Sequence, residues 1–473
     1  MRPTWVSVDL DAVAHNVAAF DALVGDAAVC AVVKADGYGH GAPAVAAAAI
    51  RAGATWLAVA LVEEATELRL SGVSAPILVL SEPRPDEMAE VVALGGVRPT
   101  LYTPAGIEAC AEAARAGAAG ELGIYEEIGP LAVHLKVDTG MHRVGVRPEV
   151  AVATAQLIID AGLNLEGVFS HLSTADVPQD PFTGVQVDRF DTILADLAAV
   201  GIQPSVVHLA NTAATLTRPD THRSLVRVGI GVYGVAPGPD VADSCRALGL
   251  RQAMSIRSQV THLQVVPAGE GVGYGHRWVG DRDTRLATVP MGYADGLARA
   301  WGLGGEALIG GRRRPLRGVV SMDALMVEVD ASVTLGDEVV LLGRQGDEDI
   351  GADQVADIIG SIPWEGLCSL GGYIFSSFSA FFSSYSFCKR RSNSAASSSL
   401  LSCSLALCRR CSGVGSLSSS FSSPVSFAST PLTLVSLANR SAAGASTGGF
   451  PGSAASAAPA PSSSQSGGSS SAS

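Results

Sequence analysis

Five polar side chains stand at or near the ends of apolar runs, where a polar group is costly to bury. Lys34 and Lys136 each end such a run, and His171, Asn211 and Arg227 belong to three later runs. A charge or polar group beside a buried strand costs free energy unless it is paired or functional. One such residue is ordinary, whereas five of them predict that their side chains meet in one site.

Lys34 has the surroundings of a reactive amine, because it ends VCAVVK and precedes ADGYGHG. A lysine partly removed from water can lose its proton and act as a nucleophile or as a Schiff-base amine. The alternative is a surface lysine just beyond the strand. The glycines that follow either let backbone approach a ligand or form a plain turn, and they match neither the Walker nor the Rossmann phosphate fingerprint.

Three other residues carry weaker indications. His171 is either part of a site or a hydrogen-bonded core histidine. Arg143, after KVDTGMH, has the planar fork that binds a carboxylate, or it is a solvated loop charge. Tyr274 lies between glycines in GVGYGHRW and is either functional or a turn residue. The sequence up to position 367 contains no HxxxH or CxxC pair, so we expect no metal site.

Eight short β-branched runs alternate with alanine-rich helical segments before position 237. The runs span residues 29–34, 55–60, 76–80, 97–102, 132–138, 166–172, 205–211 and 226–234. Buried strands that alternate with helices indicate parallel βαβ units. Eight units predict a (β/α)₈ barrel, in which catalytic residues gather at the carboxyl ends of the strands. The alternative is an open doubly wound sheet.

The texture of the chain changes twice after the barrel. The turn-rich APGPD ends the predicted barrel (residues 1–237), and residues 238–368 contain strand-like runs joined by glycine turns, which predict a smaller, mostly-β domain. Residues 369–473 are about one third serine and contain no acidic residue, a composition that predicts a disordered tail. An out-of-frame reading of the gene is an alternative origin for that tail.

Charge and cysteine usage exclude several classes of protein. The 473 residues carry a net charge of −13, which argues against non-specific nucleic-acid binding. The sequence contains no run of 18 apolar residues that would predict a membrane span. Its first residues lack the apolar core of a secretory signal. Before position 368 only Cys30, Cys110 and Cys245 occur, too few for a disulfide framework, so we expect a reducing compartment, the cytoplasm.

Eight motifs in a fixed order over residues 4–365 resemble the alanine racemases, pyridoxal-phosphate (PLP) enzymes with a barrel and a C-terminal β domain. The motifs are AVVKADGYGHGA, HLKVDTGMHRVG, SHLSTAD, HLANTAA, VRVGIGVYG, VGYGHRW, VPMGYADG and GVVSMDALMV. The resemblance implies racemisation of L- and D-alanine, with D-alanine supplied for peptidoglycan.

The resemblance also implies roles for individual residues. The implied cofactor-binding residues are Lys34, which would bind PLP covalently, and Tyr38, His171, Asn211, Thr212, Arg227, Gly229 and Ile230. Arg227 would face the pyridine nitrogen and, because a guanidinium keeps its proton, leave that nitrogen unprotonated.

The implied mechanism uses one base on each face of the substrate. Lys34 would serve the D-alanine face, and Tyr274, lent by the partner of a head-to-tail homodimer, would serve the L-alanine face with help from His171 and Arg227. The remaining implied residues are Arg143 and Met322 at the substrate, Lys136 as a carbamylation site that orients Arg143, and Tyr293 and Asp323 on the access path.

Two departures from the family pattern keep other functions in view. Trp364 stands where the family usually has a tyrosine that reaches the phosphate, and the family's closing segment is missing beyond Leu370. The alternatives are therefore a racemase made inactive by its altered end, a PLP-binding protein without catalysis, and a PLP-dependent amino-acid decarboxylase. Arg227 and Tyr274 argue against the decarboxylase.

Overall fold

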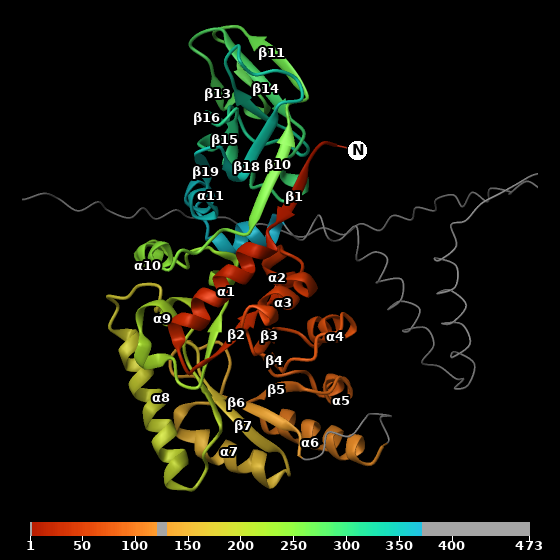
Figure 1. The fold of residues 1–473 in the computed structure, drawn as a ribbon, viewed down its shortest axis with the longest axis vertical. Coiled ribbons are helices and arrows are strands. Elements are labelled where there is room, and N and C mark those ends of the chain that lie inside the picture. The colour runs from red at the N-terminus through yellow and green to blue at the C-terminus, as the bar shows by residue number, and fades with distance from the viewer. Residues whose placement is uncertain (1, 121–129, 371–473) are drawn as a thin grey trace, which may run out of the picture. The chain divides into compact units, whose positions relative to one another are not determined.

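A computed structural model describes residues 2–120 and 130–370 of the chain (Figure 1). All of these residues belong to one compact unit. The predicted disordered tail lies outside the described residues from position 371 onward. None of the helices in the described part has the length and apolar character required to cross a membrane.

Eight parallel strands close into a barrel, which confirms the predicted fold. They are β2 (Ala28–Val32), β3 (Trp56–Val59), β4 (Ile77–Val79), β5 (Val97–Leu101), β6 (Ala132–Lys136), β7 (Asn164–Phe169), β8 (Val206–His208) and β9 (Leu225–Val228). The barrel closes where β2 pairs with β9, with Cys30 opposite Arg227. The last predicted run was too long: its strand ends at Val228, and residues Ile230–Tyr233 form a 3₁₀ turn, η4.

Helices follow the strands around the barrel (Figure 1). They are α1 (Leu10–Val24), α2 (Lys34–Gly39), α3 (Ala42–Arg51), α4 (Val62–Leu70), α5 (Met88–Ala93), α6 (Pro104–Ala118), α7 (Ala151–Asp160), α8 (Phe182–Ala199) and α9 (Thr212–Thr217). Local sequence sets their starts: Asp9 accepts hydrogen bonds from the first turn of α1, and Thr103 caps α6 immediately before Pro104. Both are preferred capping arrangements.

The second region is mostly β, as predicted. Its strands are β10 (Met254–Gln259), β11 (His262–Val266), β12 (Gly271–Val272), β13 (Trp278–Val279), β14 (Thr284–Val289), β15 (Glu306–Ile309), β16 (Arg312–Pro315), β17 (Leu325–Glu328), β18 (Glu338–Gln345) and β19 (Glu348–Ile350), with helices α10 (Ala242–Ala247) and α11 (Ala352–Ile359). The main sheet has the order β1-β10-β18-β15-β16, and β11-β14-β17 form a second sheet.

The first strand of the chain does not enter the barrel. Strand β1 (Trp5–Val8) pairs antiparallel with β10, from Trp5 opposite Arg257 to Val8 opposite Met254 (Figure 1). The preceding Arg2 donates two hydrogen bonds to the Asp295 carboxylate. The chain therefore starts in the mostly-β sheet, builds the barrel, and returns to that sheet.

The described chain ends in a helix over residues 363–370. Leu367 and Leu370 are buried on it, and Trp364 packs against the hydrophobic core. Ser369 and Leu370, which the composition assigns to the tail, are helical and are the last two residues that the structure describes.

Candidate active site

The five polar residues that were predicted to share a site lie at one end of the barrel. Lys136 is the last residue of β6, and Arg227 is the third of the four residues of β9. Lys34, His171 and Asn211 follow the ends of β2, β7 and β8 within three residues. Because all eight strands run in the same direction, their carboxyl ends form a single mouth.

Positive charge dominates this mouth. Burial holds the pKa of the His171 imidazole well below its usual range, and the cations of Arg227, Lys136, Arg143 and Lys34 lower it further, in that order. Four cations that act on one neutral imidazole create a site suited to an anionic ligand.

The segment after Lys34 adopts a left-handed turn, α2. Ala35, Asp36, Gly37 and Tyr38 have φ values between 51° and 62°. Left-handed geometry costs a non-glycine residue about 1–2 kcal/mol, so three of these four residues store strain. Strain of this kind gathers at functional sites, which favours the functional interpretation of the stretch over the plain turn.

Two carboxylates hold that turn in place. The Asp36 carboxylate accepts a hydrogen bond from the Ala42 amide at 2.7 Å. Glu64, from α4, accepts one from the Ala35 amide at 2.6 Å and a second from Ala60 at 2.7 Å. Burial and the Arg143 cation lower the pKa of the Lys34 amine, against the opposing charge of Glu64. The amine beside this turn therefore loses its proton more readily than a surface lysine.

A cradle for an anion lies where α2, α9 and η4 meet. The Thr212 hydroxyl accepts hydrogen bonds from the Gly229 amide at 2.9 Å and the Gly231 amide at 3.5 Å. A Cβ on Gly229 would stand 2.7 Å from the Tyr38 hydroxyl. The missing side chain thus lets the Tyr38 and Thr212 hydroxyls approach the backbone at the start of η4, and hydroxyls and turn amides are groups that bind phosphate. Ile230, the first residue of η4, is buried directly beside this cradle.

Arg227 is fixed by four hydrogen bonds in the barrel interior. Its Nη1 lies 2.8 Å from His208 Nδ1, and its Nη2 lies 2.8 Å from the Ser170 carbonyl, 3.1 Å from the Leu209 carbonyl and 3.3 Å from His171 Nδ1. Burial lowers the pKa of Arg227 to about 10, which still leaves the guanidinium protonated near neutral pH.

Lys136 is buried beneath the same mouth. Its Nζ donates to the Leu80 carbonyl at 3.4 Å and stands 5.3 Å above the Phe169 ring. Burial, and then the charges of Arg227, Arg143 and Lys34, lower its pKa to about 8. A substantial share of this amine is therefore neutral and nucleophilic near physiological pH.

Asn211 has a visible structural role. Its side chain accepts a hydrogen bond from the Ala214 amide as the cap of α9, and it donates to the Leu172 carbonyl at 3.2 Å. These two bonds position Thr212, the next residue. Contact between Asn211 and a cofactor stays a prediction.

The predicted residues of the mostly-β region lie on its surface. Tyr274 is 68% exposed and begins the short turn η6 (Tyr274–His276), and Met322 is 57% exposed. Tyr293 is 41% exposed, and Asp323 is also exposed. Backbone hydrogen bonds from Tyr293 to Ser321 and from Ala294 to Met322 join two of these segments.

Sequence reasoning missed three residues around the mouth. Glu64 holds the turn after Lys34, and His208 contacts Arg227. Cys368 is half-buried close to Lys34. Burial has the largest effect on the pKa of both groups, and Lys34 and Cys368 each also shift the pKa of the other. His208 lies within the predicted run 205–211, and the structure shows that the strand ends there. Glu64 and Cys368 carry no local pattern.

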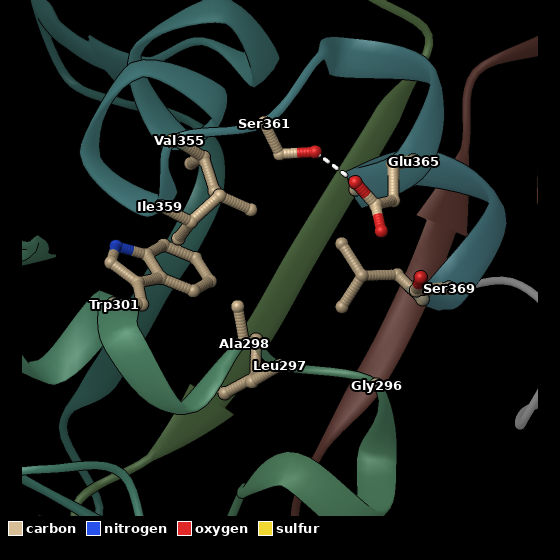
Figure 2. A pocket seen from close by; sticks show the side chains of 12 residues that line it. Gly296, Leu297, Ala298, Trp301, Val355, Ile359, Ser361, Glu365 and Ser369 are labelled. Atoms are coloured by element: carbon tan, nitrogen blue, oxygen red, sulfur yellow. Dashed lines mark hydrogen bonds between the residues drawn. The ribbon is translucent and has the colours of Figure 1, made fainter. Parts of the chain in front are cut away.

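A pocket in the mostly-β region is separate from this site. It is lined by Leu297, Trp301 and Ile359 together with the segment around Glu365 (Figure 2). None of the predicted site residues lines it. Within the described chain, no group of three or more His, Cys, Asp or Glu side chains is arranged to hold a metal ion.

Two family models match the chain. The model for the N-terminal domain of alanine racemase matches residues 8–237, and the model for its C-terminal domain matches residues 253–376. Together the two models span most of the chain and both of its structural regions.

Named relatives agree with these models. Alanine racemase of Symbiobacterium thermophilum is 43% identical over 379 residues, which cover 78% of this chain and 95% of the relative. Alanine racemase 1 of Bacillus subtilis is 38% identical over 376 residues, or 79% and 92%.

Solved structures are similar over the same extent. Alanine racemase from a D-cycloserine-producing Streptomyces lavendulae is 36% identical with a TM-score of 0.72, covering 79% of this chain and 96% of that one. Alanine racemase from Bacillus anthracis with bound L-Ala-P is 34% identical with a TM-score of 0.68, covering 78% and 93%.

Proposed function

The chain belongs to the alanine racemase family and is an amino-acid racemase, and from this premise we propose that it interconverts L- and D-alanine with PLP bound at the barrel mouth. The observation that carries the proposal is the arrangement around Gly229. An amine, a phosphate cradle and a buried guanidinium open onto one mouth, which matches the aldehyde, the phosphate and the ring nitrogen of this cofactor.

The residues present fit PLP. Lys34 would hold the aldehyde carbon, and the Tyr38 and Thr212 hydroxyls with the amides near Gly229 would hold the phosphate in the space that a Cβ would fill. Arg227 would face the pyridine nitrogen. When bound, PLP supplies an electron sink that makes the α-proton of an amino acid acidic.

The guanidinium limits what that sink can do. Arg227 can only donate hydrogen bonds, and its pKa of about 10 keeps it charged at neutral pH. A pyridine nitrogen that this guanidinium faces would therefore stay unprotonated. A restrained sink disfavours side reactions such as transamination and leaves proton exchange at the α-carbon as the main outcome.

Two bases on opposite faces would carry the proton exchange. The Lys34 amine, whose pKa is lowered by burial and by Arg143, would take or return the proton on the D-alanine face. The Tyr274 hydroxyl would act on the L-alanine face. A tyrosine hydroxyl ordinarily keeps its proton at neutral pH, and the hydrogen-bonded pair of His171 and Arg227 would help to withdraw it.

A head-to-tail homodimer would bring Tyr274 to the mouth of the partner. The exposure of Tyr274 and Met322 in the single chain supports this arrangement, because a large side chain that completes a shared site lies free on each separate copy. Met322 would contact the substrate from the same side. Tyr293 and Asp323 would line the access path.

Arg143 would bind the substrate carboxylate with its planar fork. We also propose that Lys136 is carbamylated, since a carbamate forms on a neutral amine and the pKa of Lys136 is about 8. The reaction joins the Nζ lone pair to the carbon of CO₂ and releases one proton. It turns a cation into an anion that would orient Arg143.

The cellular role follows from the product. D-alanine is a building block of peptidoglycan, and we propose that this enzyme supplies it. We place the reaction in the cytoplasm, because the cysteines found among the described residues, Cys30, Cys110, Cys245 and Cys368, are all free thiols, as a reducing compartment requires.

Chiral analysis of the product tests the proposal. The full chain is incubated with PLP and L-alanine, and we expect D-alanine to accumulate until both enantiomers are equal in amount. Release of CO₂ and an amine would instead identify a decarboxylase. Cofactor absorbance without any D-alanine would identify a carrier or an inactive racemase.

A further inference from the structure

A line of polar side chains crosses the barrel interior from Arg227 to the far side of the sheet. Arg227 Nη1 lies 2.8 Å from His208 Nδ1, His208 Nε2 lies 2.9 Å from His134 Nδ1, and His134 Nε2 lies 3.4 Å from Glu166 Oε2. Arg98 donates to the same Glu166 oxygen at 2.9 Å. We call these five residues the interior chain.

The interior chain is unusual for a barrel core, which is normally filled with branched apolar side chains. Both imidazoles are completely buried, whereas 16% of the Arg98 side chain and 19% of the Glu166 side chain are exposed. Gly167 makes room for it, because a Cβ there would stand 2.6 Å from the His134 ring. The chain thus runs from the mouth to solvent without a break.

The two ends of this chain, a guanidinium that can only donate and a carboxylate that can only accept, together set the direction of its hydrogen bonds. A guanidinium has no acceptor atom, so His208 Nδ1 must be the acceptor. A neutral His208 then carries its proton on Nε2 and donates it to His134 Nδ1. His134 in turn carries its proton on Nε2 and donates it to Glu166.

The charges agree with this direction. Burial lowers the pKa of His208 well below its usual range, and the Arg227 cation lowers it further. Burial also lowers the pKa of His134, against the opposing hydrogen bond and charge of Glu166. Burial alone would raise the pKa of Glu166, but the hydrogen bond from His134 and the charge of Arg98 bring it below its usual value. Two neutral imidazoles therefore connect a cation at the mouth to a carboxylate at the other end.

We propose that Glu166, acting through His134 and His208, is a positioning residue that fixes the orientation of the Arg227 guanidinium toward the bound cofactor. The proposal rests on the proposed function, in which Arg227 faces the pyridine nitrogen. It adds three residues of the barrel core to the machinery that presents this arginine.

The consequence of removing the carboxylate follows from the same geometry. Without Glu166, His134 Nε2–H loses its acceptor, and the opposite tautomer of His134 becomes comparable in free energy. That tautomer points a proton at His208 Nε2 and drives the His208 proton to Nδ1. Two donors, His208 Nδ1–H and Arg227 Nη1–H, would then face each other, and Arg227 must move.

Nitrogen NMR of the histidine rings in the cofactor-free enzyme tests the chain directly. The wild type should show His208 as a single Nε2–H tautomer, assigned by its loss in His208→Gln. Glu166→Gln keeps an acceptor oxygen and should keep that tautomer. Glu166→Leu removes the acceptor and should give a mixture, with roughly a tenth or more of the second form.

Turnover and absorbance of the PLP-loaded enzyme give the second readout. We expect kcat to fall about tenfold in Glu166→Leu and no more than about threefold in Glu166→Gln, with a shifted cofactor absorbance only in the former. Thr100→Val is the matched control, because Thr100 is a buried polar residue paired in register with His134 but bonded to the Val79 carbonyl. It should stay within about twofold of the wild type.

A single His208 tautomer in Glu166→Leu, together with a kcat equal to that of Thr100→Val, would overturn the proposal. If Glu166→Leu does not fold, His134→Phe keeps the ring shape and removes the link between Glu166 and His208. A kcat and a cofactor absorbance equal to those of Thr100→Val would then overturn the proposal. Absence of any racemisation by the wild type would instead refute the proposed function and would leave the tautomer result standing.

Discussion

The two regions of the molecule hold their proposed site residues in opposite ways. In the barrel, Arg227 and Thr212 are buried and held by hydrogen bonds to neighbouring strands and turns. In the mostly-β region, Tyr274 and Met322 stand in solvent. A closed barrel fixes the ends of its strands, so one chain preorganises its share of the site. In the proposed dimer, the other share would gain its surroundings when a second copy covers it.

The largest effect is expected from a substitution of the reactive lysine in the barrel. Lys34→Ala removes the amine that would bind PLP covalently, so visible cofactor absorbance and all racemisation should disappear. The measurements are an absorbance spectrum after gel filtration and chiral chromatography of the product. Wild-type turnover in this variant would contradict the proposed role of the barrel mouth, provided that its melting temperature is unchanged.

The next largest effect is expected from a substitution of the exposed tyrosine in the mostly-β region, which leaves the barrel residues unchanged. Tyr274→Phe keeps the ring but loses the hydroxyl, so the cofactor should stay bound while racemisation falls by about 10²–10⁴, the range of a general base. Loss of the cofactor together with activity would show instead that Tyr274 acts on the binding of PLP.

Mixing these two inactive variants sharpens the comparison. A dimer of Lys34→Ala with Tyr274→Phe would contain one site with both functional groups, because in the proposed dimer each copy lends its tyrosine to the other. Random reassortment should then restore about a quarter of wild-type activity. No recovery after proven subunit exchange would place both groups in the same copy.

A smaller effect concerns the phosphate cradle. Gly229→Ala introduces a methyl group 2.7 Å from the Tyr38 hydroxyl, and overpacking of this kind costs about 1–3 kcal/mol. PLP affinity should fall about tenfold to a hundredfold in a fluorescence titration. Gly184→Ala in α8 is the matched control, since a Cβ there meets nothing within 4 Å. Equal affinities in both variants would remove the cradle from the site.

The subtlest effect appears in stability, through Lys136. Its folded-state pKa of about 8 lies below its ordinary value of 10.5. Between these pH values the unfolded chain binds more protons than the folded one, so this lysine makes stability rise with pH. Lys136→Met should lack that rise, which we expect to be on the order of 2 kcal/mol.

Urea unfolding of the cofactor-free protein in bicarbonate-free buffer, at pH 7.5 and at pH 10.5, measures this difference. Curves for wild type and Lys136→Met that stay parallel across this window would mean that the buried amine is not destabilised by its surroundings. In a separate measurement, addition of bicarbonate should stabilise only the wild type, because Lys136→Met has no amine to carbamylate.

Much of the site was predictable because its residues sit in local patterns. Lys34 and Lys136 each end an apolar run, and such runs predict buried parallel strands whose ends converge. Tyr38 follows Lys34 within four residues, and the resemblance to the alanine racemases placed it at the phosphate. The Gly229 position needed that resemblance too, because nothing in VRVGIGVYG itself shows which atom approaches the glycine.

The remaining features depend on contacts between distant segments. No local pattern indicates that β1 leaves the barrel to pair with β10, because a four-residue strand of this kind fits either sheet. Cys368 reaches Lys34 from a helix more than 300 positions away in sequence.

By itself, the sequence determined the alternation of strands and helices, the chemistry available at the strand ends and the acidic balance of the chain, since these depend on residue type and on spacing within a few positions. Only the tertiary structure decided which side chains meet. The hydrogen bonds from Arg227 through His208 and His134 to Glu166 exist because closure of the barrel brings β9, β8, β6 and β7 into one interior. The left-handed turn after Lys34 is held by Glu64 from another helix, and neither arrangement is encoded in the spacing of neighbouring residues.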